Sequence, residues 1–178
     1  MNYPFSLSES MPARIDEKTL VLLNDLLGHP VEPQHDSRSN FFRIDLAPAH
    51  GAEYFFTLWF HEDGERQISA QLIQDRSDDT YFWCRTLEMA EFGGREHDLL
   101  NAFCEELEAL LTHETRIVQR KGWIFWHFHC ECRAGETWKS VGSQSAFRGS
   151  NFRFPKIEGR KRVYHSAPIA SVPRQVGG

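Results

Sequence analysis

Four stretches with strand-like patterns follow one another in the first half of the chain, separated by short polar turns. In the first of them Phe42, Ile44 and Leu46 alternate with polar residues, as a half-buried strand requires. The second is densely aromatic and leads into Asp63-Gly64, a pair typical of a hairpin turn. Strands joined by short turns run in opposite directions, so the pattern predicts an antiparallel meander. The four stretches are 41–46, 54–61, 66–73 and 81–89.

Two amphipathic helices are predicted on either side of this meander. The first begins at about Asp16 and ends at Gly28, which Pro30 follows. The second covers about 95–113 and has a continuous apolar stripe with glutamates largely off it. We expect both helices to cover one face of the sheet, because each stripe needs an apolar surface to pack on. The stripe of the second helix consists of Leu99, Leu100, Phe103, Leu107, Leu110 and Leu111.

A last hairpin is predicted from strands at 115–120 and 123–132, which turn through Lys121-Gly122. The fold class is therefore α+β, an antiparallel sheet of about six strands with two amphipathic helices on one face, in the order α-ββββ-α-ββ. We expect residues 1–132 to form a single α+β domain. Residues 133–178 are rich in Gly, Ser and Arg and predict an irregular basic tail that packs partly on the domain.

Length and composition exclude several classes of protein. A chain of 178 residues with 40% hydrophobic residues can bury a core without disulfides or a structural metal. No apolar run approaches the ~18 residues of a membrane span, so we expect no membrane partner. The segment 1–12 lacks the basic and apolar parts of a secretory signal, which favours a cytoplasmic protein. The four cysteines are expected as small core residues, since their spacing does not suit zinc: Cys84, Cys104, Cys130 and Cys132.

Charge is divided unevenly along the chain, whose net charge is −5. Up to Cys132 there are 23 acidic and 11 basic residues, and from Arg133 onward there are 2 acidic and 9 basic residues. An acidic body favours a basic protein partner and argues against nucleic acid. Three interpretations of the basic tail stay open: it grips phosphates, it lies across the acidic body of its own molecule, or it is a solvated tail.

The stretch from Trp123 to Cys132 carries the strongest candidate site. Period-two alternation places an apolar set on the core side, namely Ile124, Trp126, Phe128, Cys130 and Cys132. The other side then carries His127, His129 and Glu131 in a row. Two histidines and a carboxylate on one strand face are able to hold a divalent metal or a small ligand. The alternative is a half-exposed sheet face that meets solvent or a partner.

A binding face is predicted on the side of the sheet away from the helices. It comprises Phe55, Trp59, His61, Trp123, Phe125, His127, His129 and Glu131. Large aromatic residues on a solvent-facing surface often mark a contact surface. The alternative is that the tail, with its own phenylalanines, folds back and covers them.

The function expected from these features is a non-catalytic protein-binding module, such as a small acidic inhibitor, an immunity protein or an escort similar to secretion chaperones. The order of helices and strands is shared with class I secretion chaperones and some toxin-immunity proteins, which is an analogy of fold alone. No Gly-x-Ser-x-Gly elbow or phosphate-binding loop occurs, which argues against an enzyme without deciding the question, and no cofactor is predicted. A homodimer stays possible. The alternatives are the His127–His129–Glu131 metal or ligand site and single-stranded nucleic-acid binding.

Overall fold

The computed structural model describes residues 15–36, 41–61, 64–73, 81–147, 157 and 159–170. Its fold is α+β, with two α-helices and two antiparallel sheets among these residues. Sheet A has five strands in the order β1-β2-β3-β4-β5, and sheet B has four in the order β8-β7-β6-β9. The predicted fold class is confirmed, whereas the single sheet of about six strands is wrong.

Sheet A is the meander expected from the alternating stretches. Its strands are β1 (Gln34–Asp36), β2 (Phe41–Asp45), β3 (Tyr54–His61), β4 (Arg66–Leu72) and β5 (Tyr81–Leu87). Each strand pairs antiparallel with the next one along the chain. The short strand β1 lies in a polar segment outside the predicted strand stretches. It contains no apolar alternation and is held by its pairing with β2.

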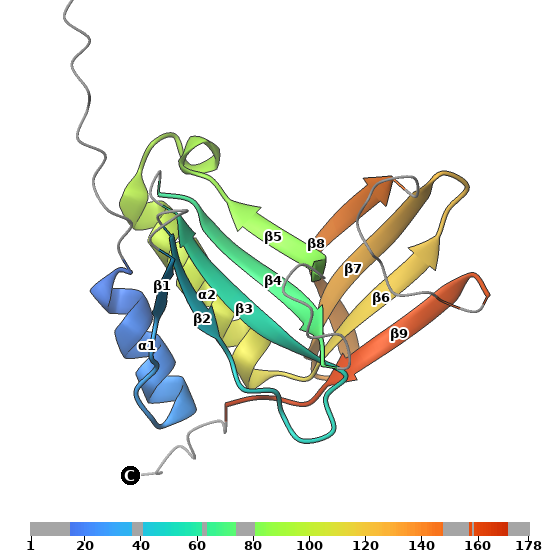
Figure 1. Cartoon of the computed structure of the whole chain (residues 1–178), viewed down its shortest axis with the longest axis horizontal. Coiled ribbons are helices and arrows are strands. Elements are labelled where there is room, and N and C mark those ends of the chain that lie inside the picture. The colour runs from blue at the N-terminus through green and yellow to red at the C-terminus, as the bar shows by residue number, and fades with distance from the viewer. Residues whose placement is uncertain are drawn as a thin grey trace, which may run out of the picture.

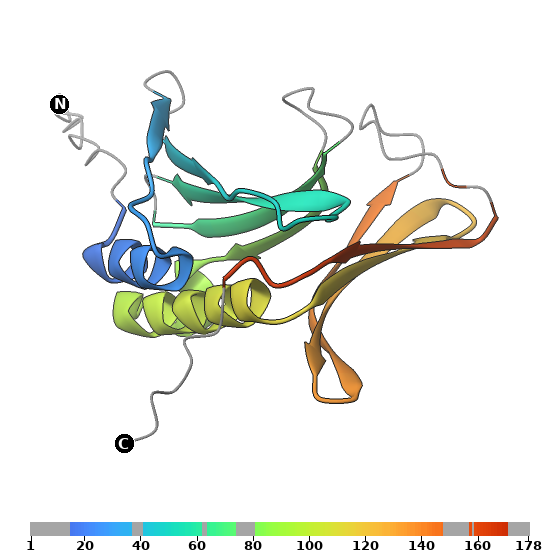
Figure 2. The same ribbon diagram turned by 90° about the horizontal axis from the view of Figure 1, so that it is seen from below.

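The two helices form where the leucine patterns place them. Helix α1 (Glu17–Leu27) begins at Asp16, whose carboxylate accepts a hydrogen bond from the Thr19 N–H at 2.7 Å. It ends at Gly28, whose φ of 72° suits glycine. Helix α2 (Glu96–Thr112) follows the 3₁₀ turn η1 (Met89–Phe92). Both helices lie on the same side of sheet A (Figure 2).

The core lies between α2 and the facing side of sheet A. Phe60 and Phe103 are fully buried, and their rings meet edge to face at 5.8 Å. Leu107 and Leu110 from the same helix stripe are also buried. The other buried residues that face α2 from sheet A include Phe56, Leu58, Ile68 and Trp83.

Sheet B consists of β6 (Thr115–Lys121), β7 (Phe125–Ala134), β8 (Thr137–Phe147) and β9 (Lys161–Ser166). Strands β8 and β9 fall in the segment for which the sequence predicts an irregular tail, so that expectation is wrong for these two ranges. Polar and charged residues dominate both strands, and their order comes from pairing with β7 and β6. Residues 148–156 and 171–178, where the covering phenylalanines of the tail were expected in part, lie outside the described residues.

The two sheets share one apolar core and diverge from it (Figure 1). The hydroxyls of Tyr54 on β3 and Thr115 on β6 share a buried hydrogen bond of 2.6 Å. On the opposite edge Gly142 of β8 lies against the Trp83 ring, where an added Cβ would lie 3.4 Å from Cζ2. The far end of sheet B, where β6 turns into β7, extends away from both helices (Figures 1 and 2).

None of the described helices is both long and apolar enough to cross a membrane.

Candidate binding surface

Three consecutive large apolar residues lie at the far end of sheet B. Trp123 is 94% exposed, Ile124 50% and Phe125 39%. The Gly122 N–H donates to the Phe125 carbonyl at 2.9 Å, so Trp123 and Ile124 occupy the two central positions of the turn between β6 and β7. We call Trp123, Ile124 and Phe125 the apolar tip. The strand was expected to begin at Trp123 but begins at Phe125, which removes Trp123 and Ile124 from its alternation.

Trp123 and Ile124 are unusual residues for the two central positions of a hairpin turn. Two-residue hairpin turns favour Asn, Asp and Gly, whose backbones adopt the required angles at little cost. Gly122, which precedes the turn, has a steric reason to be glycine. A Cβ on it would lie 2.9 Å from both the Phe125 carbonyl oxygen and His127 Nε2. The tip is therefore built on a tightly packed base but exposes apolar side chains to solvent.

The strand face that carries the histidines is the one expected. Phe128, Cys130 and Cys132 are buried on the core side, and Trp126 packs partly against the core. His127, His129 and Glu131 lie on the opposite side, which we call the outer face of sheet B, and each is partly buried. The role of these residues in binding stays a prediction.

The register of sheet B aligns the outer face in rows. One row runs across all four strands as Ser145, His127, Arg120 and Lys161. We call these four residues the basic row. His127 Nδ1 lies 2.8 Å from Ser145 Oγ, and the His127 ring lies 6.4 Å from the Phe125 ring. The basic row therefore adjoins the apolar tip on one face.

Glu131 belongs to a different group. It accepts a hydrogen bond from Arg116 Nε at 2.6 Å, and the Arg116 guanidinium lies 4.1 Å from the centre of the Trp138 ring. The carboxylate is thus used in an ion pair rather than directed at the two histidines. Within the described ranges no group of three or more His, Cys, Asp or Glu residues is arranged to hold a metal ion. The metal or ligand site on this strand stays a prediction without geometric support.

The binding-face residues predicted in the meander lie on sheet A, whereas those predicted near Cys132 belong to sheet B. Trp59 is only 8% exposed. Its Nε1–H donates to Ser69 Oγ at 2.8 Å, and Phe41 and Arg43 pack against its indole. The eight residues expected on one sheet are therefore divided. Phe55, Trp59 and His61 lie on β3 of sheet A, four lie on β7 of sheet B, and Trp123 lies in the turn before β7. Phe55 lines a cavity of about 330 Å³ with Arg43, Asp45 and Gln71.

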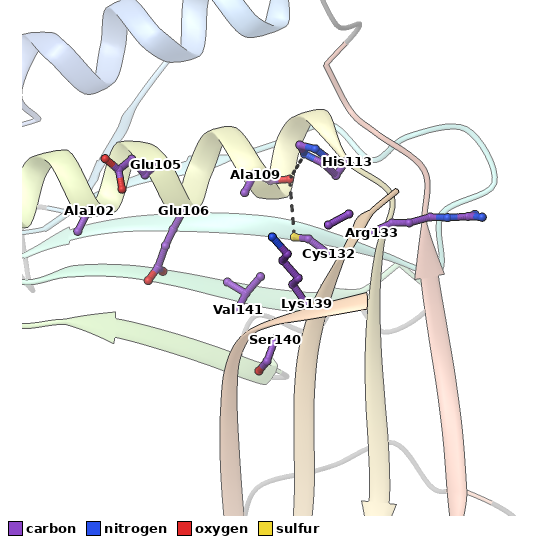
Figure 3. A pocket seen from close by; sticks show the side chains of 11 residues that line it. Ala102, Glu105, Glu106, Ala109, His113, Cys132, Arg133, Lys139, Ser140 and Val141 are labelled. Carbon is purple, nitrogen blue, oxygen red and sulfur yellow. Dashed lines mark hydrogen bonds between the residues drawn. The ribbon is translucent and has the colours of Figure 1, made fainter. Parts of the chain in front are cut away.

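A larger cavity of about 470 Å³ lies between α2 and the β7–β8 end of sheet B (Figure 3). Glu105 and Glu106 come from the helix wall, and Lys139 comes from β8. Burial raises the pKa of Glu106, although Arg85 Nε lies 3.5 Å away. The lining mixes both signs of charge and does not select one class of ligand.

The cysteines are free and packed. Cys132 lies at the edge of this cavity and donates its thiol hydrogen to the Ala109 carbonyl at 3.7 Å (Figure 3). Burial raises the pKa of Cys132 to about 11 and that of Cys130 well above its usual value. A thiol with a raised pKa is a poor nucleophile at neutral pH. All four cysteines are unpaired with each other.

Basic and acidic residues are concentrated in different elements of the fold. The four strands of sheet B contain seven basic residues and one acidic residue, Glu131. Helix α2 contains five acidic residues and no lysine or arginine. Sequence reasoning assigned the basic character to a tail. Two basic strand residues, Lys161 and Arg162, instead lie beside β6 in sheet B.

No family model, no curated protein and no solved structure matches this chain.

Proposed function

We propose that this protein is a non-catalytic protein-binding module that docks through the apolar tip. One observation carries the proposal: Trp123 and Ile124 hold the two central positions of a hairpin turn and are 94% and 50% exposed. Exposed apolar side chains at these positions reduce solubility. Their role is better explained by burial against a partner.

The size and position of these side chains suit a binding contact. Tryptophan is enriched among the residues that dominate binding energy at protein interfaces. Burial of a large apolar side chain contributes roughly 1.5–3 kcal/mol before the costs of association. Because the tip extends from the far end of sheet B, a partner with an apolar pocket is able to receive it without contact to the helices (Figure 1).

The docking surface has the opposite charge to the one that the overall composition suggests. The predicted partner was a basic protein, because the chain is acidic as a whole. The tip, however, is bordered on the outer face by two exposed basic residues, Arg120 on β6 and Lys161 on β9. Complementary charge guides association and selects partners. We therefore expect an acidic surface around the apolar pocket of the partner.

The packing of the reactive groups supports a module without catalysis. The thiols of Cys130 and Cys132 have raised pKa values, and the Glu131 carboxylate is engaged by Arg116. The four free cysteines suit action in the cytoplasm. An inhibitor, an immunity protein and an escort all fit such a module.

A capture experiment with matched variants tests the proposal. Purified protein is immobilised and exposed to an extract of the organism that encodes it. The tip variant is Trp123→Asn/Ile124→Gly, which restores favourable turn residues. The control is Val21→Ser, since Val21 is an exposed apolar residue of α1, 52% accessible.

We expect one protein to be retained in stoichiometric amount by the wild type and by Val21→Ser, and lost with the tip variant. The retained protein is then purified and its Kd measured for all three chains. Equal retention by all three, or no stoichiometric protein, contradicts the proposal.

A further inference from the structure

Two cations of the basic row lie directly opposite each other on neighbouring strands. Arg120 on β6 lies directly opposite Lys161 on β9, and both side chains are exposed. Like charges directly opposite on one sheet face destabilise the pairing, because their Cβ atoms are about 5 Å apart. Within the described part of the chain, no carboxylate forms an ion pair with either of them. An anion bound between them would offset this repulsion.

The third and fourth members of the row share one hydrogen bond and together add one more donor on the same face. His127 lies opposite Arg120, and its Nδ1 is 2.8 Å from the Ser145 hydroxyl, which fixes the ring next to the arginine. Arginine offers a planar pair of N–H donors that matches a carboxylate, and lysine offers a point charge. The row therefore presents several donors to an oxyanion within a short distance.

The row and the apolar tip are neighbours. Phe125 precedes His127 by two residues on the same face of β7, a separation of about 7 Å along a strand. A ligand that covers both must carry an apolar group and an anionic group at this spacing. A short protein segment with acidic side chains beside an apolar one meets the requirement.

We infer that the basic row binds carboxylate side chains of an acidic segment of the partner, next to the apolar residue that covers the tip. The inference rests on the proposed function and names the chemistry of the partner. A long polyanion such as a nucleic acid fits less well, because the chain carries a net charge of −5 and α2 holds five carboxylates.

Adjacent residues of β6 provide a matched pair of variants. Arg120 and Lys121 are both exposed, carry the same charge and point to opposite faces of sheet B. The variants Arg120→Gln and Lys121→Gln therefore remove the same charge from different faces. The probe is a short fluorescent peptide with glutamates flanking a leucine, and its control has glutamine in place of each glutamate. Binding is followed by fluorescence anisotropy at low and moderate salt.

We expect the glutamate peptide to bind and the glutamine peptide not to bind. Arg120→Gln should weaken binding about threefold or more, Lys121→Gln less than about 1.5-fold, and added salt should weaken the wild type. Equal binding of the two peptides, no binding of either, or equal effects of both substitutions overturns the inference. Tighter binding to vesicles containing phosphatidylserine, or to a single-stranded oligonucleotide, also overturns it.

The result separates this inference from the proposed function. If the captured partner is lost with the tip variant but binds Arg120→Gln as tightly as wild type, the function stands and the acidic-segment inference fails. If the partner binds the tip variant normally, the proposed function fails whatever the peptide does.

Discussion

The hydroxyl groups of Tyr54 and Thr115 lie 2.6 Å apart in the core and join β3 of sheet A to β6 of sheet B. They are 61 residues apart in the sequence. Both residues are almost fully buried, so neither hydroxyl has water as an alternative partner. The bond therefore couples the two sheets at the point from which they diverge.

Tyr54→Phe should lower the free energy of unfolding by about 1–2 kcal/mol, since the Thr115 hydroxyl loses its partner in a buried site. Urea unfolding measures the loss. The double variant Tyr54→Phe/Thr115→Val removes both polar groups and should be more stable than Tyr54→Phe alone. A double variant that is less stable than Tyr54→Phe would show that the hydrogen bond is not the cause.

Stability should fall as the pH rises above about 9. Burial raises the pKa of Cys132 from its usual value near 9 to about 11, and that of Tyr164 from near 10 to about 12. The unfolded chain therefore releases these protons before the folded chain does, which favours unfolding with increasing pH. The contribution is fully present below pH 9 and is lost as the pH rises through 11 and 12.

Urea unfolding of the wild type and of Cys132→Ala between pH 8 and pH 11.5 checks this expectation. The variant lacks the thiol, so its stability should fall less steeply between pH 9 and pH 11. Identical slopes for the two proteins would contradict a raised pKa at Cys132.

Gly122→Ala should destabilise the hairpin that carries the apolar tip. The added Cβ would lie 2.9 Å from the Phe125 carbonyl oxygen, which belongs to the backbone and cannot rotate away. Overpacking of this kind costs about 1–3 kcal/mol. Thermal unfolding measures the cost, and Lys121→Ala, at the neighbouring exposed position, should stay within about 0.5 kcal/mol of the wild type. Equal stability of the two variants would mean that the turn has room for a side chain.

Trp123→Asn/Ile124→Gly should leave the free energy of unfolding unchanged within about 0.5 kcal/mol, or raise it. The replaced residues are exposed, and the new ones suit a two-residue turn. Chemical denaturation checks the prediction, and static light scattering should show less self-association than in the wild type. A loss above about 1 kcal/mol would show that the tip supports the fold and would weaken its assignment to binding.

The sequence pattern correctly predicted the elements whose buried residues recur with the period of a helix or a strand. The stripe of α2 buries Leu99, Phe103 and Leu107 as expected, because a helix with leucines at this spacing has only one face to bury. The inner face of β7 is likewise confirmed at Phe128 and Cys130. Ile124 departs from this alternation, since it lies in the turn, where the period of two no longer applies.

Strands β8 and β9 were not predicted, because their sequences lack a repeating apolar pattern. Their residues are mostly polar, and Lys161 would pass for a tail residue by composition alone. Pairing with β6 across 40 residues or so of chain places it in a sheet. Long-range pairing of this kind satisfies backbone hydrogen bonds and does not require a particular order of side chains.

Apolar periodicity was enough to predict the class of the fold, both helices, the meander and the inward face of β7, because it reflects the local geometry of each element. The division of the strands into two sheets, the enclosure of Trp59 beside the exposure of Trp123, and the position of Arg120 opposite Lys161 were not predictable in this way. Those outcomes depend on which strands pair across long stretches of chain. Backbone hydrogen bonds are nearly the same for every residue type, so the local sequence does not specify which strands they join.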